Sequence, residues 1–226
     1  MDIVSFSGGK DSTAMLLMML EKGLPIDKVF CVDTTKEFPQ MYKHIEKVQI
    51  MIEPVKIEII KIDFDYWFGE HIKTKGKRKG ERGYGFPDFR NRWCTALKRG
   101  AVKKLEETIP GESVQFHGIA FDEKERTLNN KGRNIRYSLI EWQVTEKQAL
   151  DYCYSKGLDW GGLYEQFHRV SCWCCPLSRI SELRILYNEY PILWKELEEM
   201  DKKSFRRFRS DYSVKDLSEK FTNENL

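Results

Sequence analysis

Near its amino terminus the chain reads Asp2-Ile-Val-Ser-Phe-Ser7-Gly-Gly-Lys-Asp-Ser12, a short apolar run that passes directly into a glycine-containing turn. Apolar residues then recur at helical spacing as far as Gly23, which predicts a strand, a tight turn and a helix. In that arrangement the backbone N–H groups of the turn converge at the positive end of the helix dipole. The stretch therefore predicts a binding site for an anion.

The side chains of this turn fit the same anion site. Lys10 adds a positive charge and Ser12 a hydroxyl donor. Gly8 and Gly9 permit positive φ angles and carry no side chain that would obstruct a phosphate. Asp11 could cap free N–H groups or hold a Mg²⁺ ion bound to the same phosphates. Neither the spacing of a Walker loop nor that of a dinucleotide-binding GxGxxG is present.

Beyond this turn the chain alternates between short β-branched segments and helical patterns. Residues 29–32, 55–62 and 114–119 have the composition of strands. The apolar stripe over residues 38–52 and the segment from about Thr95 to Glu107 have the periodicity of helices. Such alternation predicts an α/β fold in which a parallel twisted sheet is flanked by helices.

The C-terminal part of the chain has a different pattern. Thr145 and Gln148 fit a capping box, which predicts a helix that begins there and ends at Gly157. Apolar residues at helical spacing in residues 181–188 and 191–200 predict two further helices. We therefore expect a main domain over residues 1–178 and a helical extension packed on it over residues 179–226.

The composition fits a folded chain without a membrane span. Hydrophobic residues make up 41% of the 226 residues, enough for a sizeable core. No apolar run approaches the roughly 18 residues that a membrane span requires, and no basic region precedes the first apolar stretch, so we expect a soluble, cytoplasmic protein. The net charge of +3 is too small to indicate a nucleic-acid binder by bulk electrostatics alone.

Two segments nevertheless carry concentrated positive charge. Residues 73–83 hold six basic residues, one acidic residue and three glycines, which predicts a mobile loop rather than a packed element. Residues 202–209 combine lysines and arginines with Phe205 and Phe208, a mixture suited to contact with phosphates and bases. RNA or DNA is therefore a candidate partner through these two segments, with a lid and a solvated helix face as the alternatives.

The string Ser7-Gly-Gly-Lys-Asp-Ser12 resembles the PP-loop of the adenine nucleotide α-hydrolase superfamily, and the chain most resembles its phosphoadenosine phosphosulfate (PAPS) reductase-like family. The resemblance covers about residues 2–178. It rests on several short stretches, and the order in which they follow one another along the chain is more specific than any one of them. The supporting stretches are Val32-Asp-Thr-Thr-Lys-Glu-Phe-Pro39, Arg92-Trp-Cys-Thr-Ala-Leu-Lys98, Gly118-Ile-Ala-Phe-Asp-Glu123 with Arg126, Leu139-Ile-Glu-Trp142, and Leu163-Tyr164 before Arg169-Val-Ser-Cys-Trp-Cys-Cys-Pro176.

This resemblance implies a Rossmann-related fold that binds ATP or an adenosine phosphosulfate together with Mg²⁺, and an enzyme that usually cuts between the α and β phosphates. It implies catalytic roles for Lys10, Asp11 and Arg126. The chain departs from the family where Ala120 replaces an Arg and Lys124 replaces a Ser. The nucleotide-binding residues that it implies are Ser7, Gly8, Gly9, Lys10, Asp11, Ser12, Asp33, Thr35 and Gly118.

The six cysteines fall into two groups. Cys31 and Cys153 lie in apolar patterns and are expected to be small buried hydrophobes. The string Cys172-Trp-Cys174-Cys175 packs three thiols into four residues, and a bound metal is the natural explanation. With Cys94 as the fourth ligand, the count suits either tetrahedral Zn²⁺ or a [4Fe-4S] cluster.

Two considerations favour iron–sulfur over zinc at these cysteines. The two separated CxxC pairs of a zinc ribbon are absent, and adjacent cysteines suit a larger cluster. Relatives that reduce adenosine phosphosulfate carry a four-cysteine cluster with an adjacent pair, although their cysteines are divided two and two, whereas here the division is one and three. A three-ligand cluster with one open iron and a zinc site stay as alternatives.

The resemblance also bears on the reaction. Reduction of a phosphosulfate in this family needs a nucleophilic cysteine near the C-terminus, and no cysteine follows Cys175. We therefore expect an enzyme that cleaves ATP to AMP and pyrophosphate and so activates an acceptor for sulfur transfer. The alternatives are a PAPS or adenosine phosphosulfate reductase with an unusual thiol, and a nucleic-acid-binding module with a structural metal. An adenine nucleotide is the expected small-molecule partner, and a homodimer is left open.

Overall fold

The computed structural model describes residues 1–128 and 134–224, which form two compact units. The first comprises Met1–Asp33, Pro39–Lys61 and Gly100–Glu165. The second comprises Thr34–Phe38, Ile62–Arg99 and the chain from Gln166 onward. The predicted division of the chain at residue 178 stays a prediction.

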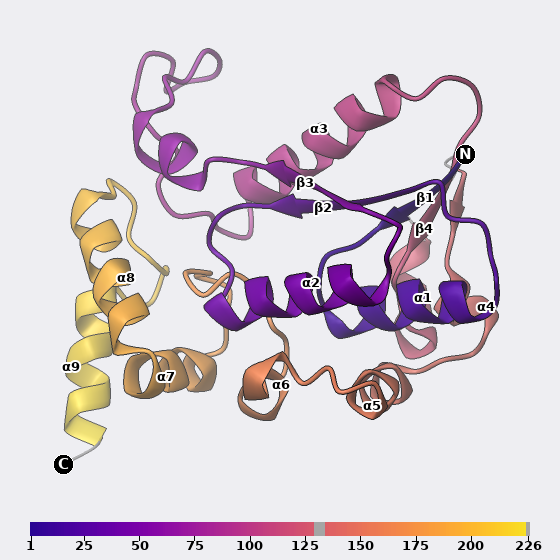
Figure 1. Ribbon diagram of the computed structural model, residues 1–226. Helices are drawn as coiled ribbons and strands as arrows, with labels where there is room; N and C mark the ends of the chain where they lie inside the picture. The colour runs from indigo at the N-terminus through magenta and orange to yellow at the C-terminus, as the bar shows by residue number, and fades with distance from the viewer. Residues whose placement is uncertain (129–133, 225–226) are drawn as a thin grey trace. The chain divides into compact units, whose positions relative to one another are not determined.

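A five-stranded, all-parallel sheet forms the centre of the first unit (Figure 1), which confirms the predicted α/β fold. Its strand order is β3-β2-β1-β4-β5, so the strand that precedes the glycine turn is the central one. The crossovers between parallel strands need intervening helices, as the alternating sequence pattern predicted. The strands are β1 (Asp2–Ser5), β2 (Lys28–Asp33), β3 (Ile57–Lys61), β4 (Val114–His117) and β5 (Ile135–Arg136).

Helices cover both faces of this sheet. On one face Leu105 of α3 (Trp93–Glu107) packs against Ile3 and Phe30 of the strands. The other face carries α1 (Lys10–Glu21) and α2 (Pro39–Met51), as Figure 1 shows. Seven residues of α1 are buried, because neighbouring elements cover this helix on most of its sides.

The remaining elements of the first unit include short helices and two 3₁₀ segments. The predicted capping box is confirmed, because the Gln148 backbone N–H donates to Thr145 Oγ1 and the Thr145 backbone N–H donates to Gln148 Oε1. The short helices and 3₁₀ segments are η2 (Phe121–Thr127), α4 (Ser138–Glu141), α5 (Glu146–Ser155), η3 (Trp160–Gly162) and α6 (Leu163–Gln166).

In the second unit, the C-terminal helices α7 (Ile180–Glu189) and α8 (Pro191–Lys203) confirm the two helices predicted there. A third helix, α9 (Val214–Glu224), was not singled out by the sequence pattern. The three helices share an apolar core that includes Leu183, Trp194 and Phe221, which explains why short helices are stable here.

The basic segment of residues 73–83 also belongs to the second unit and has more structure than predicted. An antiparallel bridge joins Ile72 to Arg82, just after the π-helical turn η1 (Tyr66–Glu70). The side chain of Lys73 is buried and forms an ion pair with Glu81, with 3.2 Å between Nζ and Oε2. The prediction that residues 73–83 form a mobile loop without packed residues was therefore wrong at Lys73.

Within the described part of the chain, no helix combines the length and the apolar character that crossing a membrane requires.

Close packing at the carboxyl end of β4 gives a test of the fold. A Cβ atom on Gly118 would lie 2.6 Å from both the backbone N and the Cα of Ser12, so Gly118→Ala forces backbone to move. We expect this change to lower the free energy of unfolding by about 1–3 kcal/mol, measured by urea denaturation with circular dichroism.

Gly100→Ala is the matched control, because a Cβ on Gly100 meets open space on α3. It should leave stability unchanged or raise it by up to about 1 kcal/mol through helix propensity. A Gly118→Ala protein as stable as the wild type would contradict the packing described for β4 and α1.

Candidate functional site

The backbone of the glycine turn is shaped by Gly8. Its φ of +76° lies in the left-handed region, and a Cβ there would come 2.9 Å from Met41 Sδ. Gly9, by contrast, has φ −74° and ψ 163° and is the N-cap residue of α1. Of the two glycines, only Gly8 therefore uses the positive φ that glycine permits.

Two serines hold the turn closed. Ser12 Oγ lies 3.0 Å from Ser7 Oγ and 3.2 Å from the Ser7 backbone N–H that donates to it. The Ser12 hydroxyl lies 3.0 Å from the Gly9 carbonyl, to which it donates. Ser12, predicted as a phosphate donor, thus takes part in the internal hydrogen bonds of the loop.

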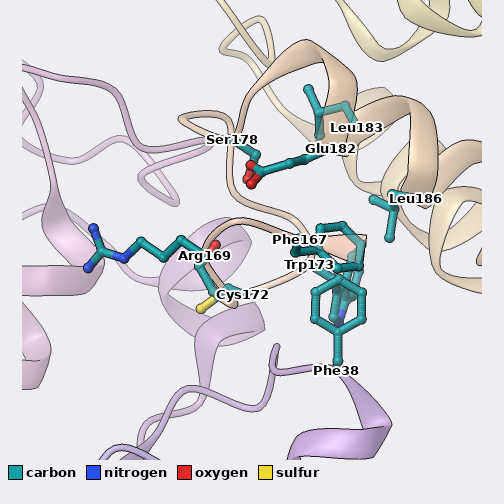
Figure 2. Close-up of a pocket in the computed structure, with 10 residues that line it drawn as sticks. Phe38, Phe167, Arg169, Cys172, Trp173, Ser178, Glu182, Leu183 and Leu186 are labelled. Atoms are coloured by element: carbon teal, nitrogen blue, oxygen red, sulfur yellow. The ribbon is translucent and has the colours of Figure 1, made fainter. Parts of the chain in front are cut away.

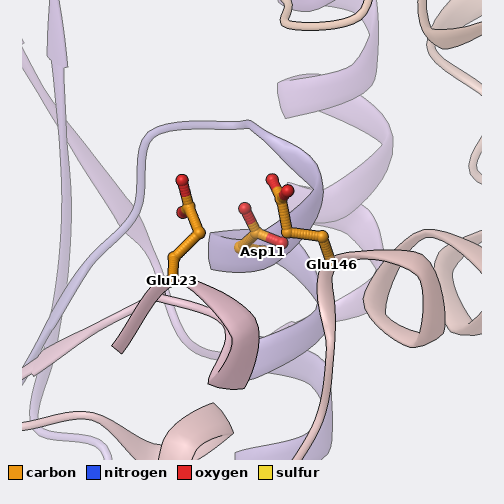
Figure 3. A group of neighbouring side chains, drawn as sticks. All are labelled: Asp11, Glu123 and Glu146. Atoms are coloured by element: carbon orange, nitrogen blue, oxygen red, sulfur yellow. The ribbon is translucent and has the colours of Figure 1, made fainter. Parts of the chain in front are cut away.

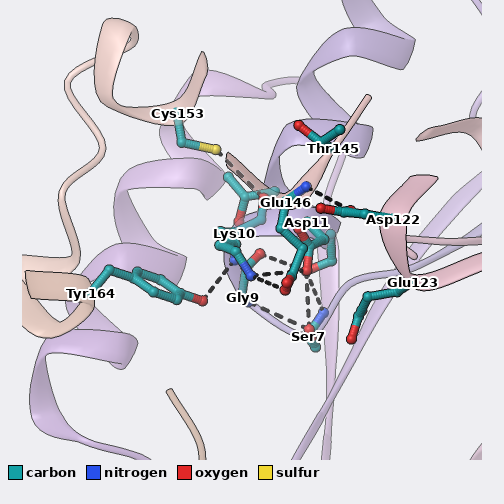
Figure 4. A network of polar contacts seen from close by, with 12 residues as sticks. Ser7, Gly9, Lys10, Asp11, Asp122, Glu123, Thr145, Glu146, Cys153 and Tyr164 are labelled. Carbon is teal, nitrogen blue, oxygen red and sulfur yellow. Dashed lines mark hydrogen bonds and ion pairs between the residues drawn. The ribbon is translucent and has the colours of Figure 1, made fainter. Parts of the chain in front are cut away.

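Lys10 lies at the start of α1 between two carboxylates. Its Nζ is 2.6 Å from Glu146 Oε1 and 3.4 Å from Asp11 Oδ2, as Figure 4 shows. Its backbone N–H donates to the Tyr164 hydroxyl over 2.9 Å. Burial raises the pKa of Tyr164, so this hydroxyl stays protonated.

Three carboxylates from three separate elements meet beside this lysine (Figure 3). Asp11 of α1, Glu123 of η2 and Glu146 of α5 each offer one oxygen within 4.8 Å of the other two. Burial raises the pKa of Asp11 to about 6, while Lys10 opposes this shift and Glu146 adds to it. Hard oxygen ligands of this kind suit Mg²⁺, which would relieve the repulsion among them.

The sequence indicated that Asp11 caps free N–H groups or holds Mg²⁺, but it did not indicate Glu123 or Glu146 as candidate ligands beside it. Glu123 was noted only as a partner of Arg126, and Glu146 only follows a helix cap. Their approach to Asp11 depends on where η2 and α5 pack, because each is more than a hundred residues away along the chain. No local pattern would have shown it.

Arg126, predicted to neutralise a phosphate, forms an ion pair with Glu123 on η2 and is half-exposed. The neighbouring Asp122 carboxylate accepts a hydrogen bond of 3.0 Å from the Glu146 backbone N–H and so fixes the start of α5. The arrangement orients Glu123 and Glu146 relative to one another. Arg126 would need to leave its partner to reach a phosphate.

The remaining residues predicted to bind the nucleotide lie at or just after the ends of strands. Asp33, at the end of β2, is buried and accepts a 3.0 Å hydrogen bond from the Tyr42 hydroxyl. Gly118 follows β4 and approaches Ser12. These two and the glycine turn lie at the carboxyl ends of neighbouring parallel strands, where open α/β sheets bind ligands. Thr35, with φ +62°, belongs to the second unit.

The cysteine loop of the second unit, residues 172–176, is held by the segment that follows β2. The Cys172 thiol lies 3.4 Å from Glu37 Oε1 and 3.4 Å from Thr34 Oγ1. The Trp173 backbone N–H donates to the Lys36 carbonyl over 3.1 Å. Thr34, Lys36 and Glu37 therefore position the first two residues of the loop.

The opposite end of the cysteine loop is held by Arg209, whose Nη1 donates to the carbonyls of Pro176 at 2.6 Å and Ser178 at 2.8 Å. A small pocket lies between this loop and α7, lined by Phe38, Arg169 and Cys172 among others (Figure 2).

The four predicted metal ligands interact electrostatically within this unit. Burial raises the pKa of Cys174, and the charges of Cys172 and Cys175 raise it further. Burial also raises the pKa of Cys175, and Cys94 adds to that shift. Buried neutral thiols are poor nucleophiles, whereas metal binding would deprotonate them.

The two candidate metals require different spacings of these sulfur atoms. A tetrahedral zinc ion, with Zn–S bonds of about 2.3 Å, needs sulfur atoms about 3.8 Å apart. Among the described residues, no three cysteine sulfurs lie within 4.8 Å of one another. Iron–sulfur and zinc therefore both stay predictions for these four cysteines. Cys31 and Cys153 are buried apolar residues, as predicted.

Comparison with known proteins agrees with the PP-loop resemblance. The model of the phosphoadenosine phosphosulfate reductase domain matches residues 2–178. An uncharacterised protein of Methanocaldococcus jannaschii is 30% identical over 207 residues, a match that covers 87% of this chain. The chain spans only 40% of the length of that relative.

Two solved structures are more distant. The U34-tRNA thiolase NcsA from Methanococcus maripaludis, solved with its [4Fe-4S] cluster, has 15% identity and a TM-score of 0.44, covering 99% of this chain and 71% of the thiolase. A predicted subunit of tRNA methyltransferase from Methanocaldococcus jannaschii has 16% identity and a TM-score of 0.36, covering 91% and 92% of the two chains. At such low TM-scores neither likeness supports an assignment of activity.

Proposed function

Because this chain belongs to the phosphoadenosine phosphosulfate reductase domain family, we propose that it is a PP-loop enzyme that binds ATP and cleaves it to AMP and pyrophosphate. The observation that carries the proposal is the position of Lys10 beside the carboxylates of Asp11, Glu123 and Glu146 at the start of α1. One ammonium group and a cation site at a helix N-terminus are what a polyphosphate requires.

In the proposed reaction, an oxygen of the acceptor bonds to the α phosphorus while the bond to the α–β bridging oxygen breaks. Pyrophosphate leaves with that electron pair, and a sulfur nucleophile then replaces the adenylated oxygen and releases AMP. The Lys10 ammonium and the first-turn amides of α1 that follow Lys10 stabilise the charge that grows on pyrophosphate. Mg²⁺ held by Asp11, Glu123 and Glu146 would add positive charge at the same place.

Lys10 must change partners when the nucleotide binds. In the structure its ammonium is shared between Glu146 and Asp11, with only 13% of its side chain exposed. A divalent cation on the carboxylates would compensate their charge and so release Lys10 for a phosphate oxygen. ATP binding and Mg²⁺ binding are therefore expected to support each other.

Cys94, Cys172, Cys174 and Cys175 are the residues proposed to hold an iron–sulfur cluster, which would supply or carry the sulfur. The reductase alternative is less well supported. Cys174 is 2% exposed and its pKa is raised by burial, so it lacks the accessible thiolate that attack on a sulfonate needs.

A nucleic-acid partner has partial support from the two basic segments. Lys75, Lys77 and Lys79 are exposed and form no ion pair with any residue that the structure describes. The half-exposed ring of Phe205 lies 4.4 Å from Lys73 Nζ. These groups suit the phosphates and bases of an RNA acceptor.

The predicted contact of residues 202–209 with nucleic acid needs correction. Phe208 is 1% exposed and packs edge-on against Phe86, so it cannot stack on a base. The arginines of residues 206–209 pair with protein groups: Arg206 with Asp88, and Arg207 with Asp216. The proposed RNA surface therefore excludes Phe208 and these arginines and rests on the three lysines and Phe205.

The proposed ATP chemistry is tested at Lys10. Calorimetry with ATP and Mg²⁺ should detect binding to the wild type, and Lys10→Ala should weaken it at least about tenfold because a charged phosphate contact is lost. AMP and pyrophosphate formation, followed by chromatography with RNA as acceptor, should fall by about 100-fold or more.

Lys47→Ala is the matched control, since Lys47 is an exposed lysine paired with Asp159 in the same unit. It should bind ATP as the wild type does. A wild-type protein that takes up no ATP, or a Lys10→Ala protein that is indistinguishable from it, would refute the proposed function.

The metal assignment is tested by anaerobic purification. The wild type should be brown, with broad absorbance in the blue and about four irons per chain. Replacing Cys94 or Cys174 by Ser should remove most of this iron, whereas Cys31→Ala and Cys153→Ala should retain it because those buried thiols belong to the first unit and are not among the proposed ligands. Colourless protein with one zinc per chain would contradict the cluster.

The RNA surface is tested by fluorescence anisotropy with a single-stranded RNA. Replacing Lys75, Lys77 and Lys79 together by Gln should weaken binding and reduce the slope of log affinity against log salt by about 2, as expected for three lost phosphate contacts. Exposed Lys43, Lys103 and Lys215, changed together to Gln, serve as the control for net charge. Equal affinities and slopes for both triple variants would rule out this surface.

A further inference from the structure

One aromatic residue contacts the glycine turn from a distant part of the sequence. The Tyr164 hydroxyl, at the first turn of α6, accepts a 2.9 Å hydrogen bond from the Lys10 backbone N–H. A Cβ atom on Gly9 would lie 3.4 Å from the same hydroxyl oxygen. Figure 4 shows the phenol pointing at the junction of Gly9 and Lys10. Tyr164 thus meets the turn where α1 begins.

The phenol is held in this position by Trp160. The indole Nε1–H donates to the Gly8 carbonyl over 2.8 Å, and the indole ring packs edge-on against Tyr164 with centroids 4.8 Å apart. Trp160 is itself buried and stacked on His44 at 4.2 Å. Trp160 therefore binds the Gly8 carbonyl and Tyr164 binds the Lys10 N–H. The contact with Trp160 leaves the Tyr164 hydroxyl little freedom to move away from the turn.

The hydrogen bonding of this hydroxyl leaves its hydrogen available. A tyrosine hydroxyl can accept hydrogen bonds and donate one. The Lys10 N–H occupies an acceptor position, and in residues 1–128 and 134–224 no acceptor receives the hydroxyl hydrogen. The Lys10 N–H is one of the first-turn amides that would otherwise face an anion. Because the Tyr164 hydroxyl accepts from that amide, the hydroxyl O–H replaces the amide as the donor available to an anion beside the loop.

We propose that Tyr164 is a phosphate-binding residue of this site: it accepts from the Lys10 amide and donates its hydroxyl hydrogen to an oxygen of the pyrophosphate portion of the nucleotide. The inference rests on the proposed function, because it names a further contact to the same ligand. The contact is to a phosphate oxygen, since the hydroxyl lies at the anion-binding end of α1 and close to Lys10.

The test compares Tyr164→Phe with the wild type by calorimetry, using ATP, pyrophosphate and AMP in the presence of Mg²⁺. Loss of a hydrogen bond to a charged oxygen should weaken the binding of ATP and of pyrophosphate by roughly 10- to 100-fold. AMP binding should change less than about twofold. Tyr154→Phe is the control, because that hydroxyl donates to Glu165 over 2.7 Å outside the turn.

The outcomes separate this inference from the proposed function. Wild-type protein that binds ATP while Tyr164→Phe binds ATP and pyrophosphate equally well, or more tightly through the freed Lys10 amide, overturns the role of Tyr164 alone. Wild-type protein that binds no ATP overturns both proposals.

A second measurement does not depend on the stability of the Phe variant. With 3-fluorotyrosine introduced only at position 164, the fluorine resonance should shift when pyrophosphate is added and stay in place with AMP. An unchanged resonance at saturating pyrophosphate would rule out the contact.

Discussion

The charge arrangement at the start of α1 is the constraint on which the proposed chemistry depends. Three carboxylates approach one another there, and one partly buried ammonium, that of Lys10, compensates two of them directly. Like charges this close are costly unless a cation joins them. The same arrangement ties α1 to α5 and prepares a place where a polyphosphate and its Mg²⁺ would complete the charge balance.

The loop around Lys10 is shaped by its own serine hydrogen bonds and by contacts from distant residues. Trp160 holds the Gly8 carbonyl, Tyr164 holds the Lys10 amide, and Gly118 allows β4 to approach Ser12. A loop fixed at several points needs little reorganisation when an anion arrives, and such preorganisation is the usual source of electrostatic catalysis. The cysteine loop follows the same principle, since Lys36 and Arg209 bind its backbone at both ends.

Basic residues divide into two kinds in the second unit. Arg206, Arg207 and Arg209 serve the structure, because planar guanidinium groups suit fixed contacts with carboxylates and carbonyls. The exposed lysines of residues 75–79 have no such contacts among the described residues. A count of positive charges along the sequence cannot separate these kinds, and this is why residues 202–209 were assigned too readily to nucleic acid.

The sequence by itself determined the parallel α/β fold, the glycine turn before α1 and the burial of Cys31 and Cys153, because these follow from local periodicity and short-range chemistry. It also indicated Asp11, the three cysteines of residues 172–175 and Cys94 as candidate ligands. Only the tertiary structure brought Glu123, Glu146 and Tyr164 to the turn and buried Phe208. Those placements depend on how elements a hundred or more residues apart pack together, and no local pattern encodes that packing.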